Sequence, residues 1–131
     1  MHNKLDKILA EISAGELIDK ITILEIKKIK INDGEKLKNI EKELSSLNET
    51  FKKVMPELSE IKILIDKLKS INLKLWDIEN AKRLAEKNNN FDEKFIELSR
   101  SVYKNNDERA KLKLEINNIL GSNIKEVKSH Y

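Results

Sequence analysis

Apolar residues recur at spacings of three and four along most of this chain, which is the period of an amphipathic helix. The longest such run covers residues 91–120, where the apolar register is interrupted only by Asn105 and Arg109. Because these polar residues fall in the middle of an otherwise apolar stripe, we expect a helix that carries a polar section within its buried face. The continuous register favours one helix over 92–120, and the alternative is two helices broken near residues 105–107.

Two helices are predicted before the turn signal that surrounds Pro56. Ser13 and Glu16 have the spacing of a capping box, in which each side chain bonds the backbone N–H of the other residue. This predicts a helix over about 14–31, although its isoleucine-rich run leaves a β-strand as an alternative. After Asn32-Asp33-Gly34, a second helix over about 35–55 has an apolar seam without a polar residue, which is typical of a coiled coil.

Pro56 is expected to start a third helix over about 56–87, because proline loses nothing at the first helical position. The register of its apolar stripe shifts near Leu68, so that Asn72 and Glu79 would occupy seam positions if the first register continued. Residues 1–12 form either a short amphipathic helix or an irregular segment. The tail, 121–131, is expected to pack in part through Ile124, Val127 or Tyr131.

These elements predict an all-α fold, an antiparallel four-helix bundle in up-down order with long, coiled-coil-like third and fourth helices. The 131 residues suffice for one domain, 1–131, with a real core. Charged residues make up 37% of the chain and only three glycines and one proline occur, which favours long helices over a sheet.

Charge and composition exclude several classes of function. The net charge is only +3 and no block of like charge occurs, so we do not expect nucleic-acid binding. The chain has no cysteine, and its two histidines, His2 and His130, lie near the chain ends; we therefore expect no metal site and no cofactor. The N-terminus lacks the apolar core of a signal peptide, and no apolar run is long enough to span a membrane. The expected location is the cytoplasm.

A set of polar residues at or beside seam positions marks the place where chemistry is most plausible. It combines carboxylates, amides, arginines and two aromatic residues from three of the predicted helices. An arginine fork can bind a carboxylate or phosphate through two hydrogen bonds, so the few arginines are stronger candidates than the many lysines. The candidate ligand-binding residues are Glu16, Asp19, Lys20, Glu25, Asn72, Trp76, Glu79, Arg83, Arg100, Tyr103, Asn106, Asp107 and Arg109.

Two interpretations of this set stay open. In the first, the residues form an ion-pair and amide network that fixes helix register, as buried polar groups do in coiled coils. In the second they line a pocket, with Trp76 as a wall, Arg109 as an anion clamp, and Glu79 or Asp107 as acid or base. Tyr103 is expected in the core with its hydroxyl at the edge.

Four stretches carry a resemblance to a known family. GELIDKITILEIKKIKI at 15–31, NLKLWDIE at 72–79, FIELSRSVYKNNDERAKLKLEIN at 95–117 and the closing LGS, EVKS and Y resemble a small bacterial family of uncharacterised helical proteins. The resemblance covers most of the chain outside 35–70, with Ser99 in place of the family's alanine. It implies a helical fold and a shared polar pattern, but it names no substrate and no catalytic residue.

Together these features predict a cytoplasmic helical protein. The leading interpretation of its function is a structural or protein-interaction module. One version of that role is a homodimer through the 35–55 seam; another is a complex with a different protein. The alternative is a small-molecule binding protein, or a metal-independent enzyme, that holds an anionic ligand in a polar pocket between helices. An ordered cavity beside Trp76, Glu79 and Arg109 would favour this alternative.

Overall fold

The structure is a computed structural model that describes residues 4–124 and residue 127. It contains four α-helices: α1 (Ala14–Lys30), α2 (Gly34–Val54), α3 (Ser59–Lys87) and α4 (Glu93–Leu120). The described residues form no strand, so the predicted all-α class is confirmed and the strand alternative for the first helix is wrong. The third and fourth helices are the longest, with 29 and 28 residues.

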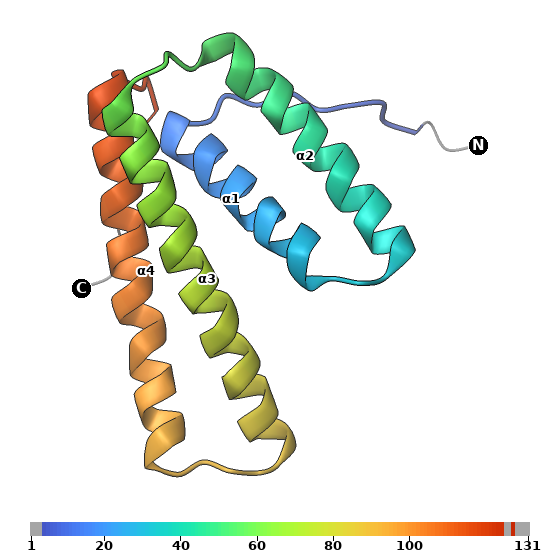
Figure 1. The fold of residues 1–131 in the computed structure, drawn as a ribbon, viewed down its shortest axis with the longest axis vertical. Coiled ribbons are helices and arrows are strands. Elements are labelled where there is room, and N and C mark those ends of the chain that lie inside the picture. The colour runs from blue at the N-terminus through green and yellow to red at the C-terminus, as the bar shows by residue number, and fades with distance from the viewer. Residues whose placement is uncertain (1–3, 125–126, 128–131) are drawn as a thin grey trace.

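Helix α1 is the central element of the fold. It packs against α2 on one side and against both α3 and α4 on the other, while α3 and α4 pair along their length. Figure 1 shows that successive helices alternate in direction and that α1 and α2 lie beside one half of the α3–α4 hairpin. The other half of the hairpin, residues 73–105, extends beyond the end of α1; we call it the distal hairpin.

Two apolar clusters explain the wide apolar face of α1. One cluster joins Ile18 of α1 to residues of α3 and α4, among them Leu68 and Ile116, which are completely buried. The second joins α1 to α2 through residues that include Leu24 and Leu44. The predicted seam of the second helix therefore packs within the chain, against α1, so a dimer would need a different surface.

The distal hairpin differs from the rest of the fold because α1 approaches it only at the end nearest the core. No residue between 73 and 105 is buried, and its apolar residues are at best half-buried. Phe91 and Phe95 make an edge-to-face contact at its tip, with ring centroids 5.3 Å apart. The core of the molecule therefore ends near Asn72 and Leu112.

Most helix ends lie close to the positions that the sequence indicates. Asp92 caps α4, which runs without a break through residues 105–107, and Gly121 ends it in a left-handed conformation with φ of 64°. Two expectations about helix starts are wrong: α3 begins at Ser59 rather than at Pro56, and Glu16 does not complete a capping box. Ser13 accepts the Glu16 N–H as expected.

The segments outside the four helices are largely solvent-exposed. Residues 4–13 form no helix, and the apolar side chains of Leu5, Ile8 and Leu9 are exposed. In the tail, Ile124 and Val127 are also exposed, so the expected packing of these two side chains is wrong. His2, His130 and Tyr131 lie outside the described residues.

Candidate functional site

A buried carboxylate, Asp19, is the centre of a polar network that joins three helices. Its side chain on α1 is only 1% exposed, whereas its partner Arg109 on α4 is 30% exposed. Arg109 donates from Nε to Asp19 Oδ1 at 2.9 Å and from Nη2 to Oδ2 at 2.5 Å, which is the two-bond fork geometry of a strong ion pair. The charge that α1 buries is therefore compensated by α4.

Asn72 on α3 completes this network. Its Nδ2 donates to Asp19 Oδ1 at 2.9 Å and to Thr22 Oγ1 at 2.8 Å, and the Thr22 hydroxyl donates to the Asp19 carbonyl oxygen at 2.8 Å. Asn72 and Thr22 are both buried. A polar network that is satisfied in this way fixes the relative positions of its helices, because shifting any one helix would strand a buried donor or acceptor.

A second polar group holds the start of α1 against the end of α4. Lys113 pairs with Glu16 at 2.7 Å, and Asn117 Oδ1 accepts the Gly15 N–H at 2.7 Å. A Cβ atom built on Gly15 would lie 2.6 Å from the Lys113 carbonyl oxygen, so the glycine allows the two backbones to meet closely. Asn117 Nδ2 is buried without a hydrogen-bond partner among the described residues.

A cleft of about 510 Å³ lies next to the first network, between α3 and α4 at the end of α1. Asn72 and Arg109 belong to the Asp19 network and also line the cleft, so the network forms one wall of the cleft. Its lining combines apolar and polar side chains. The lining residues are Ile23, Ile26, Asn72, Leu75, Trp76, Glu79, Asn80, Arg83, Val102, Asn106 and Arg109.

The charges of the cleft are balanced but unevenly placed. Asp19 compensates Arg109 at the inner wall. Glu79 and Arg83 are exposed on α3, one turn apart, and neither forms an ion pair with another described residue. Trp76 is half-buried between these two regions and provides a flat apolar surface.

Comparison with known proteins identifies the chain's family. A model of DUF6165, described as a family of unknown function, matches residues 8–131. The chain belongs to this family. No curated protein and no solved structure matches the chain. Membership of DUF6165 thus supports the predicted helical family without adding a substrate or a partner.

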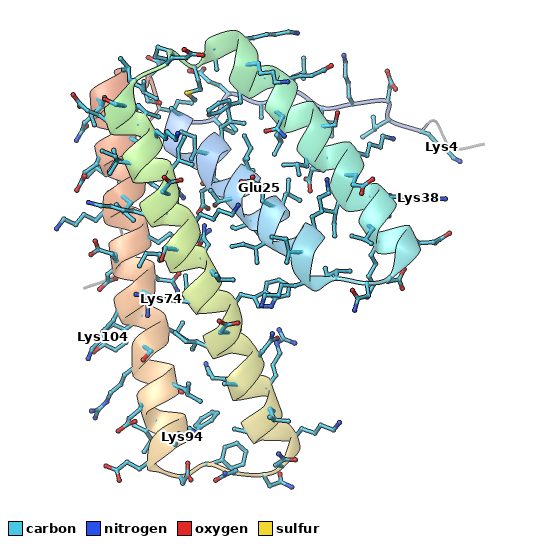
Figure 2. The ribbon with its side chains drawn as sticks, in the orientation of Figure 1. Lys4, Glu25, Lys38, Lys74, Lys94 and Lys104 are labelled. Carbon is cyan, nitrogen blue, oxygen red and sulfur yellow. The ribbon has the colours of Figure 1, made fainter. Side chains whose placement is uncertain are left out.

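Five other predicted site residues of this DUF6165 chain do not line the cleft. Glu25 forms an ion pair with Lys69 at 3.6 Å on the surface, and the Glu25 side chain is labelled on α1 in Figure 2. Lys20, Arg100 and Tyr103 are exposed and do not line the cleft, and Asp107 is half-buried outside it. The expectation that Tyr103 belongs to the core is wrong, because the distal hairpin has no core at that level.

Three residues of the two networks were missed by the sequence analysis: Thr22, Lys113 and Asn117. A signal for two of them exists in the sequence, because Arg109, Lys113 and Asn117 recur every four residues and so share one face of α4. Among the described residues no group of three His, Cys, Asp or Glu is placed to hold a metal ion. No helix in the described part of the chain is both long and apolar enough to cross a membrane.

Proposed function

We propose that this protein binds a small molecule in the cleft between α1, α3 and α4. The observation that carries the proposal is a cleft whose inner wall includes an arginine held in place by a buried carboxylate. Its volume lies within the range of about 300–1,000 Å³ that is usual for small-molecule sites. An ordered cavity beside Trp76, Glu79 and Arg109 is also the feature that separates this function from a purely structural role.

The lining residues suggest how a ligand would be bound. Because Arg109 is anchored through Nε and Nη2, little side-chain entropy is lost when a ligand contacts it. Its charge is compensated by Asp19, so Arg83 is the stronger attraction for a carboxylate or phosphate. The apolar part of the ligand would lie against Trp76, and Asn106 offers an amide to its polar groups. Of the two acid or base candidates, Glu79 lines the cleft and Asp107 does not.

The test uses the chain's single tryptophan as a reporter. Because Trp76 lines the cleft, a bound ligand should change its fluorescence, and the change should saturate. Inorganic phosphate, nucleoside monophosphates and aromatic carboxylates form the first panel, at a fixed protein concentration. Asn106→Leu should weaken binding, and Arg109→Lys should weaken it as well, because lysine keeps the charge but loses the fork.

A matched control is Asn39→Leu, which changes the same side chain at an exposed position on α2, away from the cleft. It should bind like the parent. If no compound of the panel gives a saturable change, or if the Asn106 and Arg109 variants bind as tightly as the parent, the ligand proposal is wrong. The structural or interaction role then becomes the better account.

That second role is favoured by the Asp19–Asn72–Arg109 network itself. Buried ion pairs that connect helices often specify register rather than chemistry. The two roles are compatible, because the network can fix the helices and also hold Arg109 at the cleft wall. They differ in whether the residues that only line the cleft, such as Asn106, affect binding.

A further inference from the structure

The distal hairpin leaves an apolar stripe incompletely covered. Where α1 packs against the proximal half, Leu68 and Ile116 are fully buried. In the distal hairpin, apolar side chains such as Leu75, Leu98 and Val102 are only half-buried. Apolar area that stays in contact with water does not contribute to stability, whereas burying it does. A further layer on this hairpin would recover that contribution.

One face of α3 in the distal hairpin carries apolar, charged and amide side chains at regular spacings. Trp76, Glu79, Asn80, Arg83 and Leu84 recur at spacings of three and four, so they share one face of the helix. Leu84 is 59% exposed, and the other four line the open cleft. Figure 1 shows that the end of the hairpin near the α3–α4 connection has no other helix beside it, whereas Ile23 and Ile26 of α1 line the cleft together with Trp76.

This face is complementary to itself. In a two-fold symmetric contact every pairing occurs twice: if one residue contacts a second residue on the other copy, the second residue also contacts the first residue of the other copy. If two copies of α3 cross antiparallel at the level of Asn80, Glu79 of each copy lies two residues from the level of Arg83 of the other. This is about 3 Å along the helix axis, a distance that these two long side chains can span. Trp76 then lies opposite Leu84 of the second copy, and the two Asn80 amides, each both donor and acceptor, lie opposite each other.

We propose that this protein forms a two-fold dimer through the distal hairpin, with α3 antiparallel to α3 of a second copy. A second copy fits better than an unrelated partner because a single helix face already contains both signs of charge and both apolar contacts in the required order. A parallel arrangement would place like charges opposite each other, which is unfavourable. The contact engages Trp76 and Arg83, which also line the cleft, so a second copy and a ligand would compete for these two side chains.

The test is the mass of the full chain in solution, measured by light scattering over a wide concentration range without ligand. The parent should reach twice 15.3 kDa. E79R and R83E should each weaken dimerisation by roughly 100-fold, because two opposite-charge contacts become two like-charge contacts. The combined variant E79R/R83E should dimerise again, since both contacts are restored in reverse. An equimolar mixture of the two single variants should form a heterodimer for the same reason.

Two controls separate a broken interface from a misfolded chain. Asp66→Lys makes a comparable charge change at an exposed position of α3 outside the distal hairpin and should leave the dimer intact. Circular dichroism should give the same helix content for all variants. Because the chain has no cysteine, Asn80→Cys should also form an intermolecular disulfide at the two-fold axis, whereas Ser46→Cys on α2 should not.

A parent that stays monomeric at all concentrations would overturn the dimer. A dimer that is insensitive to E79R and R83E, or single variants that fail to recover when mixed, would overturn this placement of the interface. Both results leave the ligand proposal standing, because Asn106 and Arg109 line the cleft from α4 and take no part in the α3–α3 contact. A failed titration likewise leaves the measured mass unchanged.

Discussion

Replacing Arg109 by methionine is the sharpest test of the polar network. The substitution removes the guanidinium and leaves the buried Asp19 carboxylate with Asn72 as its remaining side-chain donor. Removing one partner of a buried ion pair costs about 3–5 kcal/mol, because the other charge stays buried without compensation. Arg109 is 30% exposed, so water can reach part of the vacated space and the lower end of that range is expected.

The expected cost is large relative to the stability of the whole chain. The free energy of unfolding of a natural domain is usually about 5–15 kcal/mol. With an unfolding entropy of about 2.1 cal/mol/K per residue, a loss of about 3 kcal/mol should lower the melting temperature by roughly 10 °C. Urea unfolding followed by circular dichroism gives the free energy directly, and calorimetry gives the melting temperature.

A double-mutant cycle separates the ion pair from the space that Arg109 fills. Asp19→Leu combined with Arg109→Met removes both charges at once, and an apolar replacement of a buried pair is often neutral or stabilising. The double variant should therefore be more stable than Arg109→Met alone, with a coupling of about 2–3 kcal/mol. If Arg109→Met is neutral or stabilising on its own, the ion pair contributes nothing to the fold and the reasoning about a register-fixing network is wrong.

Two further predictions concern packing. Gly15→Ala should destabilise the chain by about 1–3 kcal/mol because its Cβ would press on the Lys113 carbonyl oxygen, whereas Gly34→Ala, which meets nothing within 4 Å, should be neutral or slightly stabilising in urea unfolding. Leu68→Ala should cost about 2–5 kcal/mol because Leu68 is completely buried, whereas Leu84→Ala should change the unfolding of the single chain little and instead weaken the dimer in light scattering. An equal loss of stability for the two glycine variants, or for the two leucine variants, would contradict the packing described above.

The helices could be predicted from the sequence because their signals are local. A spacing of three and four identifies a helix, and Asp33, Asp92 and Gly121 mark helix ends through bonds and dihedrals that involve only neighbouring residues. The exceptions are also physical. Glu16 could bond the start of its own helix, but Lys113 of α4 lies 2.7 Å away and forms the stronger, charge-assisted contact.

The candidate site was predicted only in part. Asp19, Asn72 and Arg109 could be singled out because a polar residue within an apolar stripe must find a partner. Which of these residues contact each other depends on how far each helix is shifted along its neighbour. The apolar spacing within one helix does not determine that shift. Tyr103 illustrates the same limit: its side chain is 55% exposed, whereas Val102 and Asn106 on either side of it line the cleft together with Ile26 of α1.

The position where α1 ends connects the stable part of the molecule with the part available for binding. Up to Asn72 and Arg109, three helices enclose the core and satisfy its polar groups; beyond them, the same stripe on α3 and α4 continues without a cover. The cleft lies at this boundary, so one of its walls is rigid and its other side is open. A ligand or a second copy would therefore gain contact area without disturbing the buried network. This is why substitutions at Asp19 should act mainly on folding, and substitutions at Arg109 on folding and on ligand binding. Substitutions at Glu79 and Arg83 should instead act mainly on dimerisation, and substitutions at Asn106 on ligand binding.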